Sequence, residues 1–185
     1  MTPSRQLIFV SKNPAKQNEA RQILTPLGID VVADLLTINE LQTVDTEALV
    51  RDKAMKAFRM IGRPLFVEHT GLYLDMLGGF PGGLTDIFWE SLQKDRFAKL
   101  FASKSDRALA KTHIGYVDGR RIHIFDGEIS GRIVRPRGNP RFQWDCVFEP
   151  EGSKKTFAEM GERKNDVSMR RIALEKLHGH LEKHA

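Results

Sequence analysis

Two lysines and several small polar side chains lie in one loop near the N-terminus, between an apolar run and a helical pattern. The loop covers residues 11–16 and reads Ser-Lys-Asn-Pro-Ala-Lys. A loop that enters a helix N-terminus presents unpaired backbone N–H groups and the positive end of the helix dipole, which together favour phosphate. The loop lacks the glycines of a P-loop or a dinucleotide fingerprint. Because Ser, Asn and Pro also begin helices for structural reasons, a plain helix start is the alternative interpretation.

Two glutamates, Glu40 and Glu68, and a histidine, His69, are candidates for metal binding and acid–base chemistry. Both glutamates follow apolar segments near expected strand ends, where α/β proteins place ligand-binding groups. Carboxylates there suit Mg²⁺, a hard cation that prefers oxygen ligands and bridges to substrate phosphates. A histidine titrates near neutrality, so His69 could act as a base. The alternatives are acids that face solvent and an ordinary hydrogen-bonded loop histidine.

Aromatic and polar groups gather again in the last third of the chain. The segment Phe142-Gln143-Trp144-Asp145 joins two rings to a carboxylate, and aromatic faces stack on nucleobases. Lys164 and the later segment Ser168-Met169-Arg170 bring cations and hydrogen-bond donors to an expected helix start. Core aromatics followed by a capped helix would give the same pattern, so the residues alone leave both interpretations open.

Alternating strand and helix patterns must position these groups. Strand-length apolar runs are found at 6–10, 29–32 and 64–68. Helical spacing of apolar residues is found at 15–24, 48–61, 86–101 and 166–182, and Asp45 or Thr46 can cap the second of these helices. Two alternating segments, 108–117 and 121–133, flank a turn and predict a β-hairpin, and 142–148 is expected to be a short strand or turn. Strand–helix alternation followed by a hairpin indicates an α/β fold with a mixed sheet.

Length and composition indicate a globular protein. The 185 residues are expected to form a single domain over 1–185. A single cysteine, Cys146, excludes an intrachain disulfide, and no run approaches the roughly 20 apolar residues of a membrane helix. No secretory signal is recognised, so a cytoplasmic protein without a membrane partner is expected. The formal net charge of +5 suits an anionic partner, or simply a soluble surface.

The order of these motifs resembles the inosine triphosphate pyrophosphatase family. That family opens with Thr-Gly-Asn-x-x-Lys-x-x-Glu and continues with Glu-Ile-Gln, Glu-Asp-Thr-Gly-Leu and Gly-Phe-Pro-Gly. It ends with Phe-Gly-Trp/Tyr-Asp, Thr-Phe-Ala-Glu-Met and Lys-Asn-x-x-Ser-His-Arg. The similar segments here are, in the same order, 11–19, 40–42, 68–72, 79–82, 142–145, 156–160 and 164–170.

The resemblance implies a fold and a reaction. The implied fold is an elongated mixed β-sheet flanked by helices, with two lobes and a nucleotide in a central cleft, usually in a homodimer. The implied reaction is Mg²⁺-dependent hydrolysis of non-standard purine nucleoside triphosphates (ITP, XTP and dITP) to monophosphate and pyrophosphate. A nucleic-acid partner is disfavoured, because the basic loop 135–141 is typical of a solvated turn.

The resemblance also implies site residues. Glu68, His69 and Lys16 are the implied catalytic residues, and Glu40 and Glu68 are the implied metal ligands. The implied substrate-binding residues are Ser11, Lys12, Asn13, Lys16, Thr70, Phe142, Trp144, Asp145, Lys164, Ser168 and Arg170. In this assignment Phe142 stacks on the base, and the lysines and Asn13 hold phosphates.

Three positions depart from the family pattern: His69 stands where the family has its catalytic Asp, Met169 where it has His, and Lys12 where it has Gly. A neutral imidazole can take a proton from water, but it cannot supply the same negative charge to Mg²⁺. Methionine cannot donate a normal hydrogen bond to a purine carbonyl. The alternative function is therefore a nucleotide-binding or sensing protein with little hydrolysis, and a third is an enzyme of altered specificity.

Overall fold

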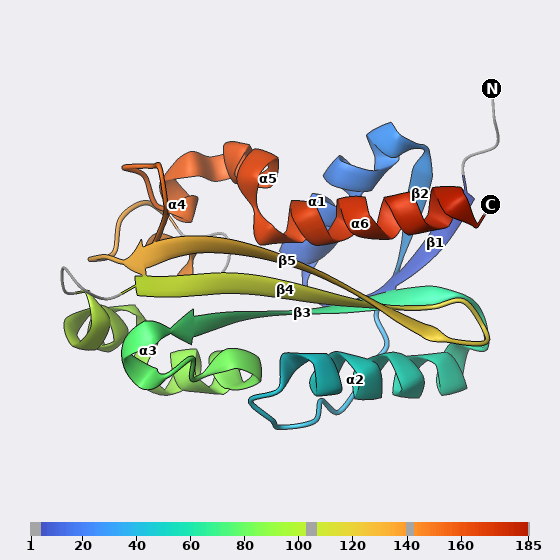
Figure 1. The fold of residues 1–185 in the computed structure, drawn as a ribbon, viewed down its shortest axis with the longest axis horizontal. Coiled ribbons are helices and arrows are strands. Elements are labelled where there is room, and N and C mark those ends of the chain that lie inside the picture. Colours follow the sequence, from blue (N-terminus) through green and yellow to red (C-terminus); the bar gives the residue numbers. More distant parts are fainter. Residues whose placement is uncertain (1–4, 103–106, 140–142, 185) are drawn as a thin grey trace.

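The computed structural model describes residues 5–102, 107–139 and 143–184. Six strands form one sheet: β1 (Arg5–Val10), β2 (Ile29–Asp34), β3 (Leu65–Leu74), β4 (Arg107–Val117), β5 (Ile122–Ile133) and β6 (Phe148–Pro150). Their order is β2-β1-β3-β4-β5-β6 (Figure 1). β1 pairs in parallel with β2 and β3, whereas the pairs from β3 to β6 are antiparallel. This mixed sheet confirms the expected α/β fold and the hairpin of β4 and β5.

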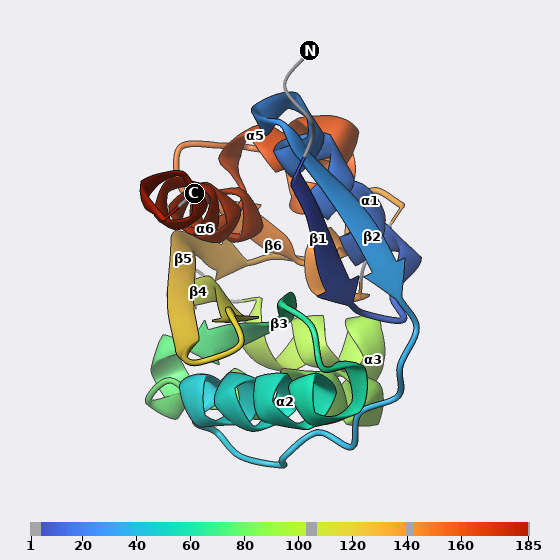
Figure 2. The same cartoon turned by 90° about the vertical axis from the view of Figure 1, so that its right-hand side faces the viewer.

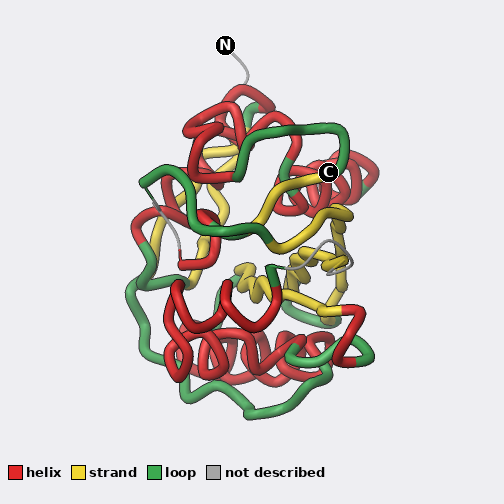
Figure 3. The backbone as a smooth tube through the Cα atoms, turned by 90° about the vertical axis from the view of Figure 1, so that its left-hand side faces the viewer, coloured by secondary structure: helices red, strands yellow, loops and turns green. Residues whose placement is uncertain are grey.

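Helices cover both faces of the sheet. The long helices are α1 (Pro14–Leu24), α2 (Thr46–Ile61), α3 (Thr85–Phe101) and α6 (Met169–Lys183). α1 and α6 lie on one face, and α2 and α3 lie on the other (Figures 2 and 3). The short helices are α4 (Phe157–Met160), α5 (Lys164–Val167) and the 3₁₀ turns η1 (Thr25–Leu27), η2 (Asp75–Leu77), η3 (Gly82–Leu84), η4 (Gln143–Cys146) and η5 (Gly161–Arg163). Within the described residues, no helix combines the length and apolar character needed to cross a membrane.

Apolar side chains hold each helical layer against the sheet. Under α1 and α6, the rings of Phe9 and Phe66 stack with centroids 4.4 Å apart and pack among buried aliphatic side chains. On the other face, α2 lies close to the strands because its buried positions include the small residue Ala54. A Cβ at Gly115 of β4 would meet Val50 Cγ1 at 2.8 Å, so α2 and β4 touch directly. Both faces of the central strands are therefore buried, which explains their long apolar runs.

β3 extends beyond the predicted segment 64–68 and includes the polar residues that follow it. His69, Thr70 and Gly71 pair with His113, Thr112 and Lys111 of β4. Thr70 and Thr112 share a hydrogen bond of 2.7 Å between their hydroxyl groups, which satisfies both in the buried sheet. The prediction that Glu68 ends its strand was wrong, because the partner strand β4 continues alongside these polar residues.

The C-terminal region also differs from the prediction. The helix expected from residue 166 is split, because Ser168 is extended (φ −78°, ψ 153°) and caps α6 by accepting a hydrogen bond from the Arg171 N–H. The segment expected as a strand or turn forms the 3₁₀ turn η4 followed by β6, and Phe142 lies outside the described residues.

The two helical connections next to β1 run over opposite faces of the sheet. α1 connects β1 to β2 over one face, and α2 connects β2 to β3 over the other face. The loop of residues 35–45 passes from the layer of β2 down to α2 along one side of the molecule (Figure 2). Ligands of open α/β sheets bind at such a switch point, outside the carboxyl ends of the parallel strands.

Candidate active site

A pocket of about 220 Å³ lies at the carboxyl end of β1, where the two crossovers diverge. Five parts of the chain line it: the end of β1 with the loop that enters α1, the loop of residues 36–40, Lys53 of α2, Asp86 of α3 and Gln143 of η4. Its charged lining residues are Lys12, Lys16, Glu40, Lys53 and Asp86. The pocket therefore brings three lysines and two carboxylates together from segments far apart in the sequence.

The loop of residues 11–16 is a capped helix start as well as one wall of this pocket. Asn13 Oδ1 accepts hydrogen bonds from the backbone N–H groups of Ala15 (3.0 Å) and Lys16 (3.2 Å). Ser11 Oγ accepts one from the Asn13 N–H at 3.2 Å. The Asn13 side chain therefore caps α1. The positive charges on this wall of the pocket come from Lys12 and Lys16.

Glu68 lies in the middle of β3 and points toward α1 and α6. Its carboxylate is 2% exposed and accepts hydrogen bonds from Arg170 Nε (2.6 Å) and Nη2 (3.1 Å). Lys16 Nζ lies 3.0 Å from Oε1. Burial raises the pKa of Glu68, but the charges of Arg170 and Lys16 outweigh it and hold that pKa well below the ordinary 4.5. Glu68 is therefore a buried anion whose two oxygens are both paired.

We expect the pairing of Glu68 to make stability depend on acid pH. A carboxyl whose pKa is lower in the folded than in the unfolded state stabilises the fold above the unfolded value. That stabilisation begins to fall as the pH drops below about 4.5 and is lost as the pH approaches the folded pKa. Urea unfolding at pH 7, 5, 4 and 3 should show a steeper loss for wild type than for Glu68→Gln. Parallel curves for the two proteins would contradict this assignment.

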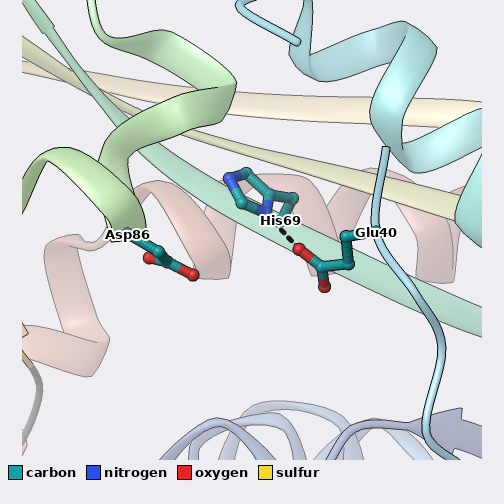
Figure 4. Close-up of side chains that lie close together, drawn as sticks. All are labelled: Glu40, His69 and Asp86. Carbon is teal, nitrogen blue, oxygen red and sulfur yellow. Dashed lines mark ion pairs between the residues drawn. The ribbon is translucent and has the colours of Figure 1, made fainter. Parts of the chain in front are cut away.

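His69, the next residue, lies on the opposite face of the sheet. Successive side chains of a strand alternate between faces, and His69 Nδ1 lies 3.5 Å from Oε2 of Glu40. Asp86, in the first turn of α3, completes a group whose potential ligand atoms all lie within 4.8 Å of one another (Figure 4). Burial raises the pKa of Glu40, but His69 and Lys53 beside the carboxylate outweigh it and lower that pKa to about 2. The structure thus pairs Glu40 with His69 and Asp86, not with Glu68.

A chain of ion pairs continues from Glu68 away from this pocket. Arg170 is 1% exposed and also pairs with Glu19 of α1, which lies 3.4 Å from Lys164 Nζ. Lys164 Nζ in turn lies 2.8 Å from Asp145 Oδ2. Burial raises the pKa of Asp145, although Lys164 opposes that shift. Glu19, Asp145 and Lys164 line a smaller hollow of about 80 Å³.

Several residues expected at the base pocket are buried in the protein interior. Trp144 is fully buried in a hydrophobic cluster and packs edge-on against Phe148 at 5.7 Å between ring centroids. Met169 belongs to the same cluster. Ser168 caps α6, and Thr70 bonds to Thr112, so both hydroxyl groups make internal hydrogen bonds. Asp145, which is also expected at the base pocket, lines the smaller hollow.

Three site residues were missed from the sequence: Asp86, Lys53 and Glu19. An acid in the first turn of a helix is common, so the sequence alone does not mark Asp86, and only the fold brings it near His69. Lys53 lies on the sheet-facing side of α2, beside the buried Ala54. A lysine on a buried helix face is a signal that could have identified it as a site residue. Its Nζ donates a hydrogen bond of 3.2 Å to the Glu68 carbonyl. Glu19 lies one turn after Lys16 in α1, and this spacing places both on the same helix face.

Comparison with known proteins agrees with this fold and motif order. The family model described as Ham1 family matches residues 7–180. An inosine triphosphate pyrophosphatase of Yarrowia lipolytica is 38% identical over 92% of this chain and 93% of its own. A dITP/XTP pyrophosphatase of Thermococcus kodakarensis is 36% identical over 91% of this chain and 92% of its own. The structure of a HAM1 protein from Coxiella burnetii superposes with a TM-score of 0.79 at 24% identity, covering 97% of this chain and 99% of that one. This chain belongs to the Ham1 family.

Proposed function

We propose that this chain is a nucleoside triphosphate pyrophosphatase that hydrolyses non-standard purine nucleotides such as ITP, XTP and dITP. Water attacks the α-phosphorus, the bond from that phosphorus to the bridging oxygen of the β-phosphate breaks, and monophosphate and pyrophosphate leave. The observation that carries the proposal is the pocket at the end of β1, which combines three lysines with two carboxylates. Relatives with this fold are named as inosine triphosphate and dITP/XTP pyrophosphatases.

The lysines of the pocket suit a triphosphate. Lys12 and Lys16 flank the N-terminus of α1, whose dipole also favours anions, and Lys53 faces them from α2. Cations held in place around a phosphoryl group stabilise the charge that builds up in the transition state. The smaller hollow beside Asp145 and Lys164 is our proposed base site. The resemblance implies that Phe142, which lies outside the described residues, stacks on the base.

A divalent cation fits the carboxylate side of the same pocket. Glu40 is ionised and half-buried, Asp86 is near it, and Nδ1 of the buried His69 lies 3.5 Å from the Glu40 carboxylate. These groups would hold the ion, which would supply charge neutralisation to the phosphates when bound. The resemblance implies Mg²⁺. The proton of the attacking water would pass to the carboxylate oxygen of Asp86 that is not used as a ligand, because Glu40 Oε1 already pairs with Lys53.

Replacing His69 by aspartate separates this function from the alternative of a nucleotide sensor. In His69→Asp we expect pyrophosphate release with Mg²⁺ to rise by about tenfold or more, because a carboxylate is the better ligand and base for that ion. The measurement is the initial rate with ITP at saturating Mg²⁺. An unchanged rate, with ITP still stabilising both proteins in a thermal shift, would favour a protein that binds nucleotides without hydrolysing them. Asp95→Asn, at an exposed position of α3, is the matched control.

Three further expectations remain predictions. The resemblance implies a homodimer, which sedimentation analysis would test. The sequence patterns favour a cytoplasmic protein and disfavour a nucleic-acid partner.

A further inference from the structure

We infer that Glu40, His69 and Asp86 form one three-ligand site that binds first-row transition ions more tightly than Mg²⁺. In this site Asp86 supplies, from helix α3, the second carboxylate that His69 cannot provide. The inference rests on the proposed function, because it names the ion of the same pocket.

The three side chains come from three different elements and approach a common space. Glu40 lies in the loop before α2, His69 in β3, and Asp86 at the start of α3. Figure 4 shows the two carboxylates on either side of the imidazole. One potential ligand atom from each lies within 4.8 Å of the other two. Ligand atoms at roughly 2.0–2.2 Å from a common ion lie about 3–4 Å apart, so small side-chain rotations would complete the site.

The His69 ring is buried but weakly held. It is 3% exposed, and its Nε2 has no hydrogen-bond partner within the described chain. Its Nδ1 lies 3.5 Å from Glu40 Oε2, which is long for a hydrogen bond. A buried polar ring without a good partner is destabilising unless a ligand satisfies it. Nδ1 is the ring nitrogen on the side of Glu40, so an ion between the imidazole and the carboxylates would bind Nδ1 and replace this long contact with a strong one.

The position of Asp86 is fixed by close backbone contacts. A Cβ at Gly71 of β3 would meet the Gly82 carbonyl oxygen at 2.4 Å, and one at Gly83 would meet that of Thr43 at 2.3 Å. Thr85 Oγ1 accepts a hydrogen bond from the Leu72 N–H at 2.8 Å. The turn that carries Asp86 is therefore held against both β3 and the loop that carries Glu40, which pre-organises the site before an ion arrives.

The charges of the group favour a cation. Lys53 pairs with Glu40 Oε1, which leaves Oε2 on the side of His69. Asp86 places a second carboxylate within reach of the same space. An added divalent cation would relieve the repulsion between the two carboxylates.

The imidazole decides which ion is preferred. Mg²⁺ takes oxygen ligands in strict octahedral geometry and gives up its waters reluctantly. Imidazole nitrogen suits transition ions, whose affinities rise from Mn²⁺ to Co²⁺. Two carboxylates and one imidazole therefore predict the affinity order Mg²⁺ below Mn²⁺ below Co²⁺, with Co²⁺ on the order of tenfold or more above Mg²⁺.

Calorimetric titration with Mg²⁺, Mn²⁺ and Co²⁺, with and without a non-hydrolysable triphosphate analogue, tests the site. We expect Asp86→Asn to weaken all three ions by about tenfold or more, and Asp95→Asn to bind like wild type. His69→Asp should reduce the ratio of Co²⁺ to Mg²⁺ affinity about tenfold. Pulsed electron paramagnetic resonance of bound Mn²⁺ should show coupling to an imidazole nitrogen in wild type, and His69→Asp should lose it.

The inference would be overturned if Asp86→Asn bound the ions with wild-type affinity. It would also be overturned if the nitrogen coupling persisted in His69→Asp. Circular dichroism of each variant identifies any failure to fold, and Asp86→Glu should retain binding if the carboxylate acts as a ligand. Because ion binding is measured without turnover, it can succeed where hydrolysis fails. Pyrophosphate release without these metal effects would leave the proposed function standing and reject the three-ligand site.

Discussion

Lys16→Met is expected to lower kcat/KM for pyrophosphate release by about 10²–10³-fold, the loss typical when one pre-organised charged donor is removed from a reacting group. Lys16 is the lysine that both lines the pocket and pairs with Glu68 at 3.0 Å. Methionine retains most of the apolar stem but removes the charge. The measurement is the rate across a range of ITP concentrations at fixed metal concentration.

The matched control for this variant is Lys94→Met, at an exposed position of α3 outside the pocket. Its kcat/KM should stay within about twofold of wild type, because an exposed lysine contributes little to a distant site. Equal activities in the two variants would contradict the role of Lys16. Thermal unfolding of Lys16→Met separates lost chemistry from lost folding, since its partner Glu68 keeps the bonds from Arg170.

Arg170→Met is expected to lower the free energy of unfolding by about 3–5 kcal/mol, the usual effect of removing one partner of a buried ion pair. Arg170 is 1% exposed and contacts two carboxylates, those of Glu68 and Glu19. Removing the guanidinium leaves Glu68 buried with Lys16 as its remaining cation in the pocket wall. For a chain of this size, such a loss corresponds to a fall of about 6–20 °C in Tm.

A double-mutant cycle isolates the interaction energy between Glu68 and Arg170. In Glu68→Gln/Arg170→Met the buried negative charge is also removed, so part of the lost stability should return. Additive losses in the double variant would contradict a direct interaction between the two side chains. Arg171→Met, which removes a half-buried arginine with partners nearer the surface, serves as the control and should lose roughly 1 kcal/mol or less.

The strands and long helices could be predicted because their signals are local. The apolar residues of β1 and the helical spacing in α2 follow from burial against one sheet, and both elements form within one or two residues of the prediction. The extension of β3 through His69 and Thr70 could not be predicted in this way. Its polar side chains are stable there because β4 and α6 supply partners about 40 and 100 residues later.

The site residues show the same difference: some carry a local signal in the sequence, and others depend on contacts that only the fold creates. Lys16 and Glu40 stand in recognisable motifs, and both line the pocket. Asp86 carries no local signal, since an acid in a first helical turn is common and stabilising by itself. Its place in the site depends on two close backbone approaches: Gly71 to Gly82 holds the turn before α3 against β3, and Gly83 to Thr43 holds it against the loop that carries Glu40. Trp144 shows the opposite case: its motif position predicts a ligand contact, whereas its ring is fully buried in the core.

Pyrophosphate release by the wild-type protein, measured with Mg²⁺, Mn²⁺ or Co²⁺ across ITP, XTP, dITP and the four standard nucleoside triphosphates, tests most directly whether this chain is a pyrophosphatase. Running the reaction in ¹⁸O-labelled water adds the position of attack. We expect release to concentrate on inosine and xanthosine nucleotides, to be faster with Mn²⁺ or Co²⁺ than with Mg²⁺, and to place the label in the monophosphate. No release with any ion, or label found in the pyrophosphate or in inorganic phosphate, would contradict the proposed reaction.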